Sequence, residues 1–136
     1  MNNYYEYNQS PYTNNWNYQP SPNTIYNQEH ARQVSRRIDL TPNMPGTDIK
    51  DLKDGFVRYT WLNVTNIQPG ETIDFRLTAS PNEQVISGGF STNPVDNVYA
   101  VTSAPNSNFP FVMVVMLHNA SSSSVLPDLW VVVKKQ

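Results

Sequence analysis

The second half of the chain follows the two-residue period of apolar and polar positions that is typical of β-strands. The alternation is clearest in residues 71–79, where every second side chain is apolar: Ile73, Phe75, Leu77 and Ala79. This segment predicts a strand that is buried on one face only. Residues 56–64, rich in aromatic and β-branched side chains, predict another strand, and the intervening Pro69-Gly70 predicts a turn.

Four further strands are predicted, and they are separated by polar loops that carry proline and asparagine. They cover residues 83–91, 97–103, 109–119 and 129–135. Short strands with no helix between them indicate an all-β fold, a small antiparallel β-sandwich of jelly-roll type.

Two apolar runs in this region do not alternate. Residues 111–117 and 129–133 are apolar on both faces, so they are predicted to be central strands or strands covered on both sides. If nothing in the domain covers the outer face of residues 112–117, a second copy of the protein is expected to do so.

The first 45 residues have a different composition, which places the sandwich domain at 46–136 and an N-terminal arm at 1–45. Within the arm, residues 29–40 carry apolar side chains on one helical face and predict a short, marginal helix. Residues 41–55 contain two prolines, a Pro-Gly and an Asp-Gly, and are interpreted as linker and turn. Asp48, Asp51 and Asp54 are three residues apart, whereas a calcium-binding loop needs carboxylates at alternate positions, so a structural turn is favoured.

Residues 1–28 hold six of the eight tyrosines and eight asparagines, but their only charged residue is Glu6. Such a segment cannot bury enough apolar area to fold alone, so it is predicted to be extended or disordered. Linkers rarely carry so many aromatic side chains, and we interpret these as groups that dock on another surface. The candidate assembly residues are Tyr4, Tyr5, Tyr7, Tyr12, Trp16, Tyr18 and Tyr26.

Composition and charge argue against several classes of function. The chain has no cysteine, and its two histidines, His30 and His118, are too isolated to predict a metal site or a catalytic triad. Asp74 and Glu83 are the carboxylates that folding could pair, but no pattern points to catalysis. We expect no enzyme and no cofactor. A net charge of −2 without a basic stripe argues against binding to nucleic acid. No apolar run is long enough to cross a membrane.

Gly88 and Gly89 interrupt a predicted strand, which indicates a bulge or a place where another group comes close. From this point the order of segments "VISGGFST", "SAPNSN" and "HNASSSSV" resembles H-type lectin-like β-sandwich modules over about residues 84–133. The usual cysteine near the C-terminal strand of that family is absent. The resemblance implies the sandwich fold, and with it a glycan as a candidate ligand.

A sugar site would need an exposed aromatic platform with polar partners nearby. Residues that offer parts of one are Tyr99, Asn106, Asn119 and Trp130. The alternative is that Trp61 and Trp130 are core residues and that the asparagines serve turns.

A cysteine-free sandwich with a tyrosine-rich arm resembles bacterial spore-surface and appendage proteins, and is compatible with virion decoration proteins. The expected function is a structural subunit that self-associates, or binds another surface-layer protein, when its arm adds a strand to an open sheet edge. The alternative is a lectin-like module that the arm tethers. The N-terminus does not resemble a secretory signal, so synthesis in the cytoplasm and release by lysis, on a spore surface or virion, are expected.

Overall fold

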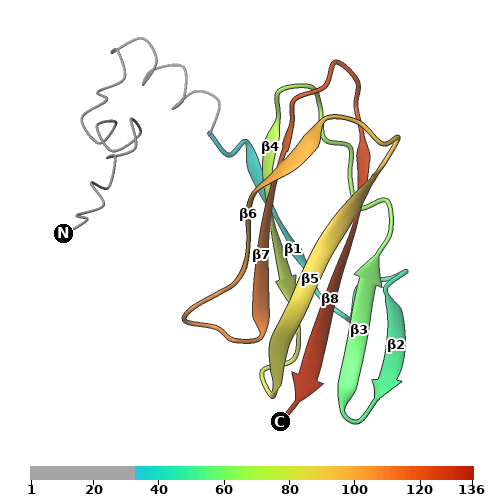
Figure 1. The fold of residues 1–136 in the computed structure, drawn as a ribbon, viewed down its shortest axis with the longest axis vertical. Helices are drawn as coiled ribbons and strands as arrows, with labels where there is room; N and C mark the ends of the chain where they lie inside the picture. The colour runs from blue at the N-terminus through green and yellow to red at the C-terminus, as the bar shows by residue number, and fades with distance from the viewer. Residues whose placement is uncertain (1–32) are drawn as a thin grey trace, which may run out of the picture. The chain divides into compact units, whose positions relative to one another are not determined.

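A computed structural model of the protein describes residues 33–136, which form two packed β-sheets and no helix (Figure 1). The predicted all-β sandwich is confirmed, and so are all six predicted strands. The arm with its seven candidate aromatic residues, and residues 29–32 of the predicted helix, lie outside the described residues. The strands are β1 (Arg36–Leu40), β2 (Asp48–Lys53), β3 (Phe56–Trp61), β4 (Thr72–Thr78), β5 (Glu83–Asn93), β6 (Val98–Pro105), β7 (Val112–Asn119) and β8 (Leu126–Lys135).

Each sheet has four strands. The order is β1-β4-β7-β6 in one, which we call sheet A, and β2-β3-β8-β5 in the other, which we call sheet B. The apolar strands β7 and β8 are central in their sheets, as predicted from their lack of alternation. Five of the six strand pairings are antiparallel, and β1 pairs with β4 in parallel.

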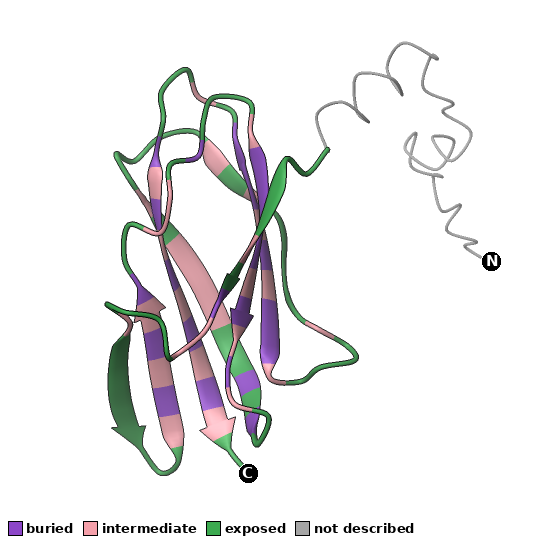
Figure 2. Ribbon diagram, turned by 180° about the vertical axis from the view of Figure 1, so that it is seen from behind, coloured by how far each residue is buried: buried purple, intermediate pink, exposed green. Residues whose placement is uncertain are grey.

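The core lies between the sheets and is built from alternate side chains of the central strands. Figure 2 shows this alternation as bands of buried residues along the strands. The predicted inward face of β4 is fully buried at Ile73, Phe75 and Leu77, and β7 supplies Val115 and Leu117 beside it. Burial of these side chains stabilises the sandwich by about 1.5–3 kcal/mol for each of them.

The helix predicted for residues 29–40 is wrong over residues 33–40, because residues 33–35 have no regular structure and Arg36–Leu40 form β1. An isolated helix of this length is marginal, whereas pairing with β4 provides backbone hydrogen bonds and buries Leu40 completely. The strand pairing therefore decides the conformation. It also moves the start of the sandwich from residue 46 to Arg36.

Strand β2 lies in the segment that was interpreted as linker and turn. All six of its residues are exposed, so the two-faced pattern that reveals a buried strand is missing. The predicted Asp-Gly turn does follow it, with positive φ at Lys53, Asp54 and Gly55. Within residues 33–136 no three acidic or histidine side chains are grouped closely enough to hold a metal ion, and no helix there could span a membrane.

Glu71 ties the β1 edge to the turn before β4. Its carboxylate accepts hydrogen bonds from Arg36 Nε at 2.8 Å, Ser35 Oγ at 2.9 Å and the Gln68 backbone N–H at 2.8 Å. Burial alone would raise the pKa of Glu71, but the hydrogen bonds from Arg36, Gln68 and Ser35, with the charge of Arg36, lower the pKa overall.

Because the pKa of Glu71 is lower in the folded state, the stability it contributes is present above its ordinary pKa. That stability is lost as the pH falls through the folded-state value. We expect Glu71→Gln to lower the free energy of unfolding at neutral pH by about 1 kcal/mol and to remove part of the loss seen on acidification. Urea titrations at neutral and acidic pH would measure this, with Asp39→Asn as the control for an exposed ion pair. An unchanged pH profile in Glu71→Gln would contradict the assignment.

Candidate functional site

The outer face of sheet B carries an aromatic side chain at its centre, on β8. Leu129, Val131 and Val133 of this strand point inward and are fully buried, so the alternation turns Asp128 and Trp130 outward. Trp130 is half-buried. Its neighbours across the sheet are Thr60 on β3 and Gly89 on β5.

The two glycines of β5 make room for large side chains on opposite faces. A Cβ atom at Gly89 would lie 2.7 Å from Trp130 Cζ2 and 3.0 Å from Trp130 Nε1, so the indole lies across this position. A Cβ atom at Gly88 would lie 3.1 Å from the Met113 side chain. The expected bulge is also present, at Ile86. Gly89 therefore allows the Trp130 ring to lie against the sheet.

A hollow of about 470 Å³ lies beside the indole on this face. Its apolar lining includes Leu52 and Leu62, which are 39% and 60% exposed. Charged groups from three strands also line it, namely Asp48, Arg58 and Asp128. Within residues 33–136, Arg58 Nε and Thr60 Oγ1 are buried atoms without a hydrogen-bond partner. The hollow thus combines apolar surface with charged side chains, and the two unpartnered atoms lie beneath its surface.

A second hollow, of about 620 Å³, lies on the opposite face of sheet B beside β2. Ile49 and Asp51 line it, with Val57 and Tyr59 of β3. Ile49 pairs with buried Tyr59 and points to the inner side of the sheet, yet it is 57% exposed. The inner side of β2 is therefore left uncovered by the rest of the described domain.

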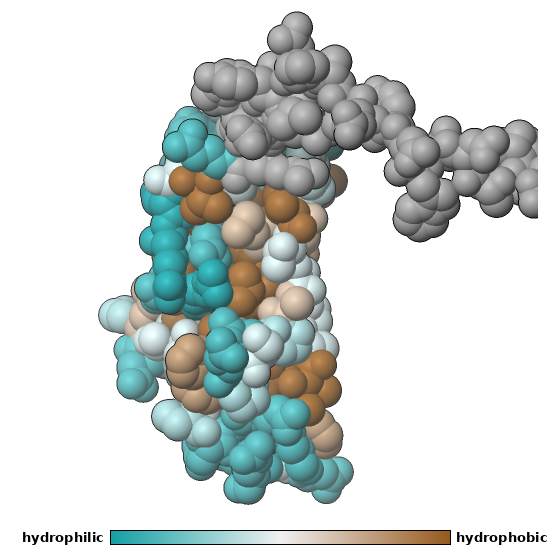
Figure 3. Space-filling model, turned by 90° about the vertical axis from the view of Figure 1, so that its left-hand side faces the viewer, coloured by the Kyte–Doolittle hydropathy of each residue, from teal (hydrophilic) through white to brown (hydrophobic). Residues whose placement is uncertain are grey.

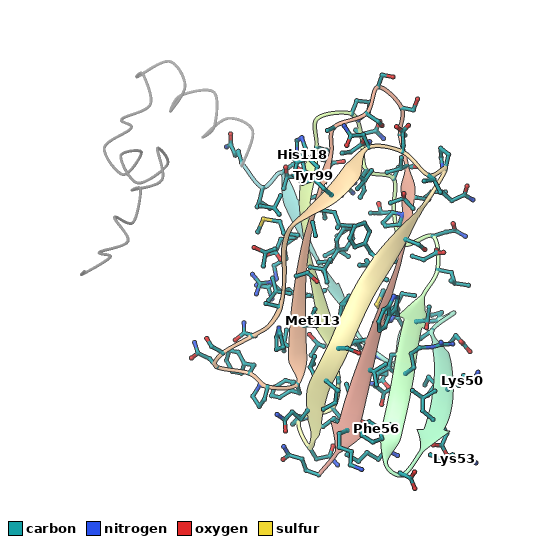
Figure 4. The ribbon with its side chains drawn as sticks, viewed as in Figure 1. Lys50, Lys53, Phe56, Tyr99, Met113 and His118 are labelled. Carbon is teal, nitrogen blue, oxygen red and sulfur yellow. The ribbon has the colours of Figure 1, made fainter. Side chains whose placement is uncertain are left out.

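The four residues proposed for a sugar site do not lie together. Trp130 is on sheet B, whereas Tyr99 is on β6 of sheet A, where its ring lies 5.2 Å from the His118 ring (Figure 4). Asn106 serves the loop after β6, because its side-chain oxygen accepts the backbone N–H groups of Asn108 and Phe109. The expectation of one site built from these residues is therefore wrong.

Asn119 is a structural residue. It is fully buried, and its side chain donates to the carbonyls of Ile67 and Ser123 and accepts hydrogen bonds from Ser121. Its hydrogen-bonding capacity is used by the loop between β7 and β8 and by the segment before β4. Asn119 cannot serve as a ligand residue without unfolding these loops.

The two tryptophans that were interpreted as core residues have different roles. Trp61 is 4% exposed and donates from Nε1 to the Thr41 carbonyl at 3.0 Å, so it does belong to the core. Trp130 does not belong to the core, because its side chain lies on the outer face of sheet B. Because β8 is apolar on both faces, its sequence pattern does not indicate which face Trp130 occupies.

The two carboxylates considered as a catalytic pair have separate partners. Asp74 binds Arg76 at 2.7 Å in sheet A. Glu83 is buried and accepts hydrogen bonds from the Tyr59 hydroxyl at 2.9 Å and from the Ser80 backbone N–H at 3.0 Å. Burial, then the hydrogen bond and the charge of Glu83, raise the pKa of Tyr59 to about 12. Glu83 therefore joins β3 to the turn before β5, whereas the Asp74–Arg76 pair lies within β4.

The outer face of sheet A has a mixed character. Val114 and Met116 of β7 point outward but are half-buried, with the Asp74–Arg76 pair on the neighbouring strand. Seen from this side, apolar and polar side chains are intermixed (Figure 3). A second copy of the protein is therefore not required to cover β7.

The fold and its surfaces define an all-β sandwich domain with two hollows on sheet B. The chain belongs to the YjdH family, whose sequence profile matches residues 36–133. This match begins at the first residue of β1 and ends within β8, so it covers seven strands completely and most of β8. Comparisons with curated proteins and with solved structures gave no match.

Proposed function

We propose that this protein is a non-enzymatic assembly subunit, in which residues 1–28 of one copy add a strand to β2 of the next. The observation that carries this proposal is the uncovered inner side of β2, with Ile49 57% exposed at an inward-facing position beside the 620 Å³ hollow. Exposed strand edges are templates for pairing with another chain. A strand added to β2 would lie beside this hollow and cover it.

The other edges of the two sheets are less suited to this pairing. β5 and β6 each carry a bulge, at Ile86 and Val101, and bulges interrupt the ladder of backbone hydrogen bonds. β1 has five residues in regular register, but its inward-facing side chains are already covered, because Leu40 is buried and Ile38 is half-buried. The irregularity in β2 lies at its end, between Asp51 and Lys53, so its first four residues remain regular.

The arm has the chemistry to occupy this edge. Tyr5 and Tyr7, like Trp16 and Tyr18, are two residues apart, so in an extended strand each pair points to one face. Tyrosine and tryptophan are prominent among the residues that dominate interface energies. A fully extended segment of this length reaches about 90 Å, enough to meet a neighbouring copy. Head-to-tail contacts of this kind build rings, or filaments when the rotation does not close.

We further propose that the assembly is located on a spore surface or virion after synthesis in the cytoplasm, and the tyrosine-rich arm supports this location. Phenolic side chains can stack there or be cross-linked by oxidation. Another surface-layer protein that presents a similar edge is the alternative partner.

Ile49→Lys in the full-length chain tests the role of β2. The substitution places a charge in the proposed contact between the arm and β2, and it removes the isoleucine that the added strand would bury. We therefore expect self-association to weaken by about tenfold or more. Sedimentation velocity over a range of concentrations measures this. Val95→Lys is the matched control, because Val95 is 93% exposed in the loop between β5 and β6. Equal association in Ile49→Lys and the unaltered protein would exclude β2 as the docking edge.

A further inference from the structure

We propose that the outer face of sheet B binds a neutral oligosaccharide, with the Trp130 indole as its platform. This site is separate from the assembly edge. Asp48 and Ile49 are neighbours on β2, but Asp48 lines the hollow beside Trp130 and Ile49 lines the hollow on the other side of the sheet. The two proposals can therefore fail independently.

The first argument is the way the aromatic ring is held. The indole fills the space over Gly89, where a side chain of any other residue would meet it at 2.7 Å. One side of the ring is thus braced by the sheet, and the ring also borders the 470 Å³ hollow. Sugars bind aromatic rings through the C–H groups of the pyranose face, and a braced ring loses little freedom when a ligand arrives.

The second argument is the polar lining. Asp128 uses Oδ1 to accept the Asn63 backbone N–H at 2.7 Å, and its other oxygen has no partner within the described residues. Asp48 is exposed and likewise makes no side-chain hydrogen bond there. Carboxylates accept hydrogen bonds from the hydroxyl groups of a ligand. The Arg58 guanidinium can donate hydrogen bonds to the hydroxyl oxygens of the same ligand. A ligand rich in neighbouring hydroxyls satisfies both kinds of group.

Charge and size narrow the class of ligand. Two carboxylates and one guanidinium leave the lining with a net negative charge, which disfavours anionic sugars. The volume of about 470 Å³ lies in the range of small-ligand sites and suits a short stretch of sugar chain rather than a protein partner. Equatorial β-1,4 linkages keep successive rings extended and flat, which matches a sheet face. Cellohexaose is therefore the probe of choice.

Calorimetric titration of the full-length protein with cellohexaose tests the site. We expect saturable binding that weakens by roughly tenfold or more in Trp130→Ala and by less in Trp130→Phe. Asp48→Asn, a change at an exposed residue that leaves the core untouched, is expected to weaken binding several-fold. Thermal unfolding of each variant checks that the sandwich is intact.

Two controls separate this site from other surfaces. Tyr99→Ala removes the exposed aromatic ring of sheet A and should leave the affinity unchanged. Ile49→Lys should also bind cellohexaose normally, even where it no longer self-associates. The proposal is overturned by absence of binding, by equal affinity in Trp130→Ala, or by a preference for anionic polygalacturonate over cellohexaose.

Discussion

A chain that begins at Gln33 is expected to fold as the sandwich and to sediment as a monomer, while the full-length protein forms higher oligomers or fibres. Within residues 33–136, the eight strands and every residue of the core cluster lie at Arg36 or beyond, so a chain that begins at Gln33 keeps all of them. The removed segment supplies every aromatic residue that we assign to assembly. Loss of oligomers without loss of the folded state is therefore the expected result.

The starting residue of the truncated chain matters. A chain that began at Pro45 would lack β1, and with it the buried Leu40 and the ion pair between Arg36 and Glu71. Its failure to assemble could then reflect a damaged fold. Beginning at Gln33 avoids this, and equal urea midpoints for the two chains would verify it.

Sedimentation velocity followed by electron microscopy distinguishes the outcomes. If the chain from Gln33 still assembles, the arm is not the assembly element and the proposed function is wrong. If both chains are monomers, self-association through the arm is excluded, and a different protein becomes the candidate partner of the arm. Adding a peptide of residues 1–28 in excess should inhibit assembly of the full-length protein, because it competes for β2.

Replacement of Asn119 by leucine is expected to destabilise the sandwich by about 2 kcal/mol or more. The leucine would remove the two amide hydrogen bonds to the carbonyls of Ile67 and Ser123, and it would leave the Ser121 backbone N–H without its acceptor. The two carbonyls would keep one donor each, the Val125 N–H and the Ser121 hydroxyl. Each buried polar group left unsatisfied costs about 1–3 kcal/mol. For a domain of this size the melting temperature should fall by more than about 10 °C.

Urea unfolding followed by circular dichroism measures this loss, and Asn106→Ala is the matched control. Asn106 also accepts two backbone hydrogen bonds, but in an exposed loop where water replaces them, so its loss should cost about 1 kcal/mol. A variant Asn119→Leu with ordinary stability would contradict the structural role.

The sequence predicted individual strands well but not the composition of a binding site. A site depends on which side chains face the same surface, and that depends on the pairing of distant strands. Trp130 and Gly89 are 41 residues apart in number, yet they are directly opposed across β8 and β5. The double glycine was noticed for its unusual place in a strand, although nothing nearby in the sequence indicated which ring it accommodates.

The sequence by itself determined the all-β class and the six strands from β3 to β8, because the two-residue alternation of apolar side chains is a local property of the chain. Its unusual arm also supports the assembly proposal. Only the tertiary structure decided that Arg36–Leu40 form a strand, that β2 exists, and that Trp130 lies outside the core while Asn119 lies within it. These features depend on strand pairing and on which face each sheet buries. Both arise from contacts between segments far apart in the chain, and local sequence patterns do not record them.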